Sequence, residues 1–324
     1  MADGVQLADD LQASSPEIAL ALSRAGVSGV QKAVRIRRGD AETVMAAVID
    51  CTVDLAADQK GVHMSRFPEL FEDAIELVVE REALLVEVLA EHIASSVVER
   101  QGALKAEVWI RAQWPIHRRT PVTELATQEM VTLCGIAAAS ESGTRRAVGV
   151  EATGINACPC AQGLVRNRAS ERLLDAGFDA GDVERILELV PIATHNQRGR
   201  QTLFVGTEQD LDAEVLVDVA ERSMSAPIYD LLKRPDELFV VEHAHLQPRF
   251  VEDSVRLMLG TMLSELGGEL EDGDFLQARQ VNFETIHNHD VLAERFGTVG
   301  ELRGELATGE PSPRQTTLAA WLSR

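Results

Sequence analysis

The residues best suited to chemistry begin with the motif Cys158-Pro159-Cys160 and with His195, which lies in the polar segment 194–199. Thiolate and imidazole groups are both good ligands for Zn²⁺ and Fe²⁺, so the two motifs together predict a metal site. Pro159 favours a turn, which leaves open whether Cys160 shares the metal or whether both cysteines are simply buried. A lone histidine is more often a surface or satisfied core residue, so each motif alone is weak evidence.

A carboxylate and two imidazoles follow within the segment 284–289. If this segment is helical, Glu284 and His287 share one face, a spacing that suits a carboxylate orienting a catalytic histidine. A histidine pair taken alone, such as His243 and His245, is ambiguous.

The few basic residues are concentrated in short segments, as an acidic protein that binds an anion would need. Segment 60–67 places His63 and Arg66 just before a predicted helix, which predicts an anion-binding surface; the alternative is an ordinary strand-to-helix loop. Segment 233–237 taken alone is most simply a solvated turn. Glu252 opens a predicted helix, where it could merely complement the helix dipole.

The elements that must position these residues alternate between strand and helix. Periodicity predicts strands at 33–37, 44–55, 105–116, 129–139, 146–156, 201–205, 238–244 and 276–283. It predicts helices at 16–25, 68–78, 84–98, 169–176, 180–190, 210–224 and 251–266, with a polar tail after the last strand. This order predicts an α+β fold with antiparallel sheets, divided into an arm (1–30), a first module (31–122) and a second module (123–324) with a helical insertion at 163–190.

Composition bounds the class of protein. The chain has 324 residues, 45% of them hydrophobic, and a formal charge of −21, which argues against a nucleic-acid or anionic-membrane surface because both need clustered Lys and Arg. No apolar run approaches the roughly 20 residues of a membrane span, and the N-terminus lacks a secretory signal. We therefore expect a cytoplasmic protein whose four cysteines are core residues, ligands or nucleophiles rather than disulfide partners. Cys51, on the apolar face of its strand, is expected in the core.

Taken together, the segments resemble the GTP cyclohydrolase IB family, which includes an archaeal branch. The matching segments, in the family's order, are KGVHMSRF (60–67), ACPCAQG (157–163), THNQRG (194–199), APIYDLLKRPDE (226–237), RFVEDSVR (249–256) and FETIHNHD (283–290). The resemblance implies a tandem tunnelling fold: two ββααββ-like modules whose antiparallel sheets assemble into barrels in a homo-oligomer, usually a tetramer. It also implies active sites at subunit interfaces.

The resemblance assigns roles residue by residue. Cys158, His195 and Glu237 look like ligands of a catalytic divalent metal, Fe²⁺, Mn²⁺ or Zn²⁺, with Cys158 also counted among the catalytic residues. Glu252 looks like the anchor of the guanine ring, and Glu284 with His287 looks like the acid/base pair. We further expect the substrate-binding residues, phosphate contacts among them, to include His63, Arg66, Arg198 and Lys233.

The implied reaction is metal-dependent hydrolysis of GTP at C8, with release of formate and formation of a 7,8-dihydroneopterin phosphate for pterin or folate synthesis. The product is either the triphosphate or the 2′,3′-cyclic phosphate. Two other classes compete: a 7-cyano-7-deazaguanine reductase, which has the same fold but needs NADPH and no metal, and a non-catalytic protein that binds metal and a purine nucleotide. The first does not match the pairing of ACPCAQG with THNQRG, and the second leaves Glu284 and His287 unexplained.

Overall fold

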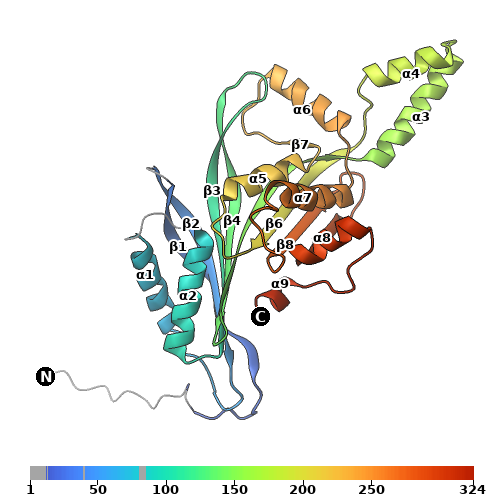
Figure 1. Ribbon diagram of the computed structural model, residues 1–324. Helices are drawn as coiled ribbons and strands as arrows, with labels where there is room; N and C mark the ends of the chain where they lie inside the picture. The colour runs from blue at the N-terminus through green and yellow to red at the C-terminus, as the bar shows by residue number, and fades with distance from the viewer. Residues whose placement is uncertain (1–11, 13, 39–40, 80–84) are drawn as a thin grey trace.

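The computed structural model describes residues 12, 14–38, 41–79 and 85–324, which form one long antiparallel sheet with helices packed mainly on one face (Figure 1). Within these residues the sheet has nine strands in the order β1-β2-β3-β4-β5-β6-β8-β9, and the short β7 pairs with β5. The expected α+β class with an antiparallel sheet is confirmed.

The strands and helices follow one another along the chain in two similar sets. The strands are β1 (Leu22–Arg38), β2 (Ala41–Leu55), β3 (Lys105–Arg119), β4 (Ala126–Ser140), β5 (Gly143–Ala157), β6 (Asn196–Gly206), β7 (Ala226–Pro227), β8 (Phe275–Asn282) and β9 (Val291–Thr298). The helices are α1 (Arg66–Val79), α2 (Val86–Gln101), α3 (Pro159–Asp175), α4 (Ala180–Leu189), α5 (Ala213–Arg222), α6 (Arg234–Leu246), α7 (Val251–Glu265), α8 (Val299–Thr308) and α9 (Leu318–Trp321).

Alternation of apolar and polar residues builds the strands, as β2 illustrates. Met45, Ala47, Ile49 and Cys51 are almost fully buried, while the residues that alternate with them are more exposed. The position predicted for Cys51 in the core is confirmed, and burial raises the pKa of its thiol to about 12. The turn signal at residues 39–40 lies outside the described residues.

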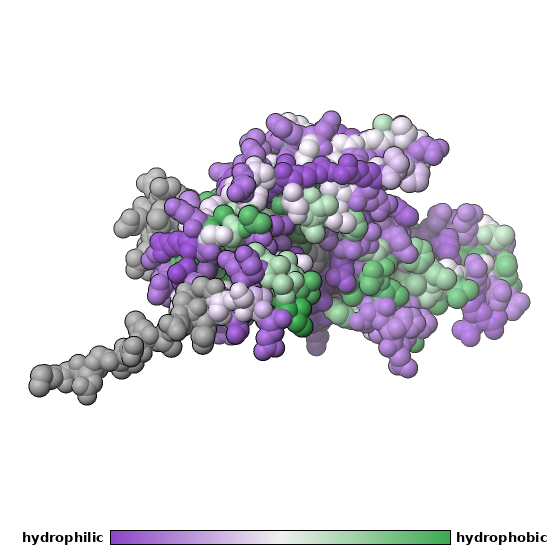
Figure 2. All heavy atoms as spheres, turned by 90° about the horizontal axis from the view of Figure 1, so that it is seen from below, coloured by the Kyte–Doolittle hydropathy of each residue, from purple (hydrophilic) through white to green (hydrophobic). Residues whose placement is uncertain are grey.

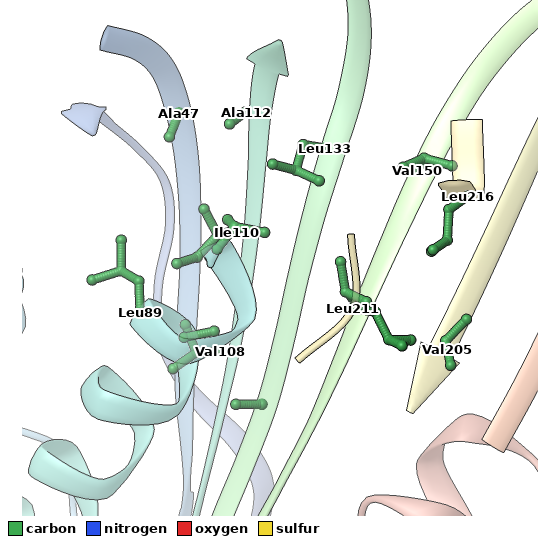
Figure 3. Close-up of a cluster of buried hydrophobic side chains, with 14 of the residues drawn as sticks. Ala47, Leu89, Val108, Ile110, Ala112, Leu133, Val150, Val205, Leu211 and Leu216 are labelled. Atoms are coloured by element: carbon green, nitrogen blue, oxygen red, sulfur yellow. The ribbon is translucent and has the colours of Figure 1, made fainter. Parts of the chain in front are cut away.

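The main core lies between the sheet and the helices α1, α2, α5 and α7. Figure 3 shows part of it, where aliphatic side chains from neighbouring strands meet residues of α2 and α5. A smaller core on the opposite face of the sheet is closed by the C-terminal α9, whose Trp321 packs against Phe275 with ring centroids 5.8 Å apart. The sheet is therefore buried on both faces over parts of β4, β5, β6 and β8.

The hairpin of α3 and α4 projects away from the sheet (Figure 1). None of the residues of α3 is fully buried, and Leu164, Leu174 and Phe178 are exposed. Figure 2 shows the mostly hydrophilic surface expected from the net charge, interrupted by smaller hydrophobic areas. None of the described helices is long and apolar enough to cross a membrane.

Several predicted elements need correction. The helix predicted at 16–25 is wrong, because β1 begins at Leu22 and pairs with β2; the arm expected over 1–30 therefore overlaps a strand. The strand predicted at 238–244 is wrong, because this segment belongs to α6. The polar tail is also wrong, since it contains β9, α8 and α9.

The boundary predicted at 122/123 falls between β3 and β4, two strands that pair over their full length. The order ββααββ is completed by β4, which ends at Ser140, and the division into modules remains a prediction. The predicted insertion contains α4 and most of α3. Helix α3 begins earlier than expected, because Pro159 occupies its first turn, whereas α4 begins at Ala180 as predicted.

Candidate functional site

Cys158 and His195 are brought together by the ends of β5 and β6. Ala157 pairs with Asn196 in the sheet, and the next residues along are Cys158 and His195. The Cys158 N–H donates to the His195 carbonyl oxygen at 3.1 Å, and the Thr194 hydroxyl donates to the Cys158 carbonyl oxygen at 2.8 Å. Directly opposed residues of an antiparallel pair have Cβ atoms about 4.5–5.5 Å apart, so the two side chains lie within reach of one ion.

The N-terminus of α7 is fixed beside this strand end. The Arg249 N–H donates to the Ala157 carbonyl oxygen at 3.0 Å, and the buried Asn156 amide donates to the Ser254 hydroxyl at 3.1 Å. Glu252, in the first turn of α7, is exposed. Strand pairing and helix docking therefore place the predicted guanine anchor at the same end of the sheet as Cys158.

Glu284 reaches the site because strand pairing continues beyond β8. The Phe283 N–H donates to the Arg198 carbonyl oxygen at 2.9 Å, which holds the following residue against β6. The Glu284 side chain is 5% exposed, and its Oε1 accepts a hydrogen bond from Gln197 Nε2 at 3.0 Å. The Gln197 Oε1 in turn lies 3.0 Å from His195 Nδ1. The three side chains form a continuous polar chain.

This arrangement fits a divalent metal. The second Glu284 oxygen, Oε2, is buried 3.7 Å from His195 Nδ1 and has no hydrogen-bond partner among the described residues. Polar groups on the Nδ1 side of an imidazole are typical of metal-binding histidines, because they fix the tautomer and leave Nε2 for the metal. With Cys158 adjacent, the donor set suits Zn²⁺ or Fe²⁺.

Glu237 does not join this pair within one chain. Across the described residues, no three His, Cys, Asp or Glu side chains lie close enough together to hold one ion. Glu237 is exposed in the first turn of α6, and Lys233, the N-cap residue, is exposed as well. The expected Cys158, His195 and Glu237 set remains a prediction.

Asp236 holds the start of α6 in place. It is fully buried, and its carboxylate accepts hydrogen bonds from the N–H groups of Val122, Thr123 and Lys233 and from the Thr123 hydroxyl. Burial alone would raise the pKa of Asp236, but these hydrogen bonds outweigh it and hold the pKa below its usual range. The neighbouring residues Lys233 and Glu237 are thereby attached to the loop between β3 and β4.

A second group of carboxylates surrounds Arg118 near the same end of β3. Arg118 pairs with Glu221 at 2.5 Å and with Glu129 at 3.5 Å. Burial raises the pKa of Glu221 to about 7 and that of Glu129 to about 6, although Arg118 opposes both shifts. This group therefore changes charge near neutral pH.

The helical condition under which Glu284 and His287 would share one face is not met, and the pair remains a prediction. Residues 283–290 form a bend rather than a helix, because the backbone of Phe283 and the Thr285 hydroxyl bond to β6 instead. His287 is exposed and stacks on His289 with ring centroids 5.1 Å apart. Within one chain, Glu284 contacts Gln197 and His195 rather than His287.

The remaining predicted residues lie at two different places. Arg198 is exposed on β6, next to the site. His63 and Arg66 line a small cavity with Asp54, which accepts a hydrogen bond from the N–H of Lys105 at the start of β3. That end of the sheet is where β5 begins, whereas Cys158 follows the end of β5. A strand of 15 residues spans about 45 Å, so one chain cannot bring His63 and Arg66 to Cys158.

Sequence reasoning missed Gln197, Asn156 and Ser254, which support the site residues. Gln197 lies in the segment already singled out for His195 and on the same strand face two residues further on. This spacing of two residues could have indicated that Gln197 lies beside His195. The contact of Asn156 with Ser254 depends on the docking of α7 and has no signature in the sequence.

Comparison with known proteins identifies the family. A family described as type I GTP cyclohydrolase folE2 matches residues 8–293 of the chain. The chain belongs to this family. The GTP cyclohydrolase MptA of Methanothermobacter thermautotrophicus is 40% identical over 305 residues, covering 92% of this chain and 95% of that protein. The corresponding protein of Methanosarcina acetivorans is 38% identical and covers 92% of this chain and 96% of that protein. The resemblance found in the six sequence segments is confirmed.

Solved structures bear on the fold. The uricase from Arthrobacter globiformis has a TM-score of 0.50, with 9% sequence identity, and covers 87% of this chain and 96% of that chain. At this identity the likeness shows the fold alone. It confirms the expected tunnelling fold.

Proposed function

We propose that this protein is a metal-dependent GTP cyclohydrolase that opens the purine of GTP at C8, releases formate and yields a 7,8-dihydroneopterin phosphate for pterin or folate synthesis. The observation that carries the proposal is the meeting of Cys158, His195 and Glu284 at the ends of β5, β6 and β8, in a chain of the type I GTP cyclohydrolase family. The names of the archaeal relatives support GTP as the substrate.

The metal would be held by the Cys158 thiolate, the His195 imidazole and the Glu237 carboxylate. A set of three protein ligands leaves an open position, as catalytic sites require. A divalent cation bound there would supply Lewis-acid chemistry, lowering the pKa of water and polarising the purine. Because Glu237 lies apart from the other two ligands within the chain, completing the set requires either a movement of α6 or an α6 from another subunit.

The side chains around the metal would bind the substrate and move protons. Glu252, exposed at the start of α7, would accept hydrogen bonds from the N–H groups of guanine. Water addition at C8 opens the five-membered ring and leaves a formamide, and a second water releases formate from it. Rearrangement of the ribose and closure of a new ring with loss of one water then give the dihydropterin, so the net reaction consumes one water. His287 would deliver the proton to the leaving ring nitrogen, and Glu284 would serve as its acid/base partner.

A homo-oligomer, which we expect to be a tetramer, would complete the site. His63 and Arg66 lie at the opposite end of β5 from Cys158, so they could serve the same substrate only if they came from another subunit. Arg198 and Lys233 are exposed and would contribute positive charge for the phosphates, Arg198 from the chain that supplies Cys158 and Lys233 from the chain whose α6 supplies Glu237. His287 is likewise exposed and could be covered by the partner.

The decisive experiment is an anaerobic assay of metal-free protein with GTP and added Fe²⁺, Mn²⁺ or Zn²⁺. Formate release that requires metal is expected, and the mass of the pterin distinguishes a triphosphate from a 2′,3′-cyclic phosphate product. Cys158→Ala should lose metal and activity, whereas Cys160→Ala, a change at an exposed residue of the same motif, serves as the matched control. Stabilisation by GTP without formate from any metal would replace this proposal with a non-catalytic binding protein.

The composite site can be tested by mixing two inactive variants. Arg66→Ala and Cys158→Ala, unfolded together and refolded, should regain up to about one quarter of wild-type activity, since random assembly leaves that share of sites with both intact residues. Mixtures that stay inactive, while wild-type protein treated in the same way recovers, would place Arg66 outside the active site.

A further inference from the structure

Gln197 lies between the predicted metal ligand His195 and the carboxylate of Glu284. Gln197 is only 5% exposed, and the oxygen and the nitrogen of its side-chain amide each have one hydrogen-bond partner. Oε1 lies 3.0 Å from His195 Nδ1, and Nε2 donates to Glu284 Oε1 at 3.0 Å.

The carboxylate determines which way this amide points. An ionised carboxylate only accepts hydrogen bonds, so it requires the NH₂ group of Gln197 on its side. The reversed amide would place two oxygens against each other and would direct NH₂ towards His195. With the orientation fixed, Gln197 Oε1 can only accept, and His195 Nδ1 must therefore carry the proton.

We propose that Gln197 is a positioning residue that keeps His195 in the Nδ1-protonated form, so that Nε2 is the atom offered to the metal. That a metal binds here depends on the proposed function, whereas the protonation of His195 at Nδ1 follows from the hydrogen bonds alone. Glu284 acts mainly through Gln197, because its own closest oxygen is 3.7 Å from His195 Nδ1, which is too long for a hydrogen bond.

The strand geometry makes this relay rigid. His195 and Gln197 lie two residues apart, and Asn156 of β5 is the cross-strand partner of Gln197. Glu284 is held by the hydrogen bond from Phe283 to Arg198 on the same strand as Gln197. Thus all three relay residues are attached to one strand, and the relay needs no bound metal to form.

Two variants separate the proposed role from a packing role. Gln197→Leu removes both hydrogen bonds while keeping a side chain of similar size, and the loss of such an outer partner lowers metal affinity by about 10–100-fold. The double variant Gln197→Glu with Glu284→Gln reverses the relay. Its new carboxylate still accepts from His195 Nδ1 and also from the new amide, so Zn²⁺ affinity should return to within about threefold of wild type.

A matched control is Gln201→Leu. Gln201 is a fully buried glutamine on the same face of β6, and no hydrogen bond links it to His195. This variant should bind Zn²⁺ as the wild-type chain does. A loss of affinity equal to that of Gln197→Leu would mean that any apolar substitution on this strand disturbs the site, and would overturn the assignment.

The full-length protein is measured in two ways: Zn²⁺ affinity by competition with a chromophoric chelator, and the tautomer of His195 by ¹⁵N NMR of histidine-labelled, metal-free protein. We expect Nδ1–H in the wild type and in the double variant, and loss of that preference in Gln197→Leu. An Nε2–H tautomer in the wild type, or unchanged Zn²⁺ affinity in Gln197→Leu, would refute the role of Gln197. A wild-type chain that binds no Zn²⁺ but shows Nδ1–H would count against the proposed metal site alone.

Discussion

Replacing Glu87 with glutamine should stabilise the fold at alkaline pH and have little effect in acid. Glu87 lies on α2 and is 3% exposed, and its Oε2 has no hydrogen-bond partner among the described residues. Arg146, the cation whose charge acts on Glu87, is already paired with Glu91 at 3.1 Å and with Asp210 at 2.8 Å. Burial therefore dominates and raises the pKa of Glu87 from 4.5 to about 7, with the negative charges of Asp210 and Glu91 adding to the shift and Arg146 opposing it.

The size and sign of the effect follow from this pKa. Below pH 4.5 both the folded and the unfolded chain carry a protonated Glu87, and the side chain imposes no charge penalty. Between pH 4.5 and about 7 the unfolded chain loses the proton first, so the free energy of unfolding falls as pH rises. At one pKa unit per 1.36 kcal/mol, the full loss above pH 7 is about 3 kcal/mol. Glutamine keeps the shape and removes this loss.

Urea unfolding at pH 5 and pH 8, at one protein concentration, measures the effect. The gain of Glu87→Gln over wild type should be small at pH 5 and should reach about 2–3 kcal/mol at pH 8. Glu91→Gln is the control, because Glu91 lies one turn further along α2 but bonds to Thr144 and Arg146, so its variant should lose stability rather than gain it. A Glu87→Gln gain that is the same at both pH values would refute the argument from burial.

Three further predictions concern the interior beside the site. Gln201→Leu should raise the free energy of unfolding by about 1–3 kcal/mol in urea titrations, because both amide atoms of Gln201 are buried without partners among the described residues. Gly199→Ala should lower it by about 1–3 kcal/mol, since a Cβ there would lie 2.2 Å from Gln280 Nε2; a neutral result would mean that Gln280 moves freely. Asp236→Ala should lower the melting temperature by several degrees and weaken metal binding, since it releases the start of α6, and calorimetry with metal analysis would detect both.

Local sequence patterns correctly predicted the strands and helices in which the spacing of apolar residues matches the face that is buried. β2 was found from its alternation and α7 from its helical period, and both exist close to the expected limits. Segment 238–244 was wrongly predicted as a strand because it is rich in apolar residues, as buried strands are. Pro235 in the first turn and the buried Val240 and Ala244, four residues apart, were the signals for the helix that forms instead.

The elements that were missed depend on distant partners. The first residues of β1 pair with the end of β2, from Leu22 opposite Leu55, and the ladder is interrupted by irregularities that blur the alternation. β9 has only partial burial and is defined by its pairing with β8. Such strands have little periodicity of their own, so a reading of short windows cannot detect them.

For the site, the sequence indicated which residue types could do chemistry but not which of them lie close together in the fold. The neighbouring positions of Cys158 and His195 follow from the β5–β6 register, although residues 159–194 separate them in the sequence. The two strands can pair because α3 and α4 fold outside the sheet (Figure 1). Within one chain Glu284 contacts Gln197 rather than His287, because residues 283 and 285 bond to β6 and the segment forms a bend instead of a helix. Spacing rules assume a secondary structure, and here that assumption failed.

The division of the site between sheet and helices has a mechanical consequence. Cys158, His195 and Glu284 follow or precede strands whose backbone hydrogen bonds fix them, so the proposed metal-binding half of the site is held in place before any ligand arrives. Glu252 and Glu237 lie in the first turns of α7 and α6, where they are exposed and free to meet a substrate or another subunit. Changes in the strand ends or at Glu237, the proposed third ligand, should therefore alter metal affinity first, whereas changes at Glu252 should alter KM for GTP first. A Glu252→Ala variant that kept its KM but lost its metal would contradict this division.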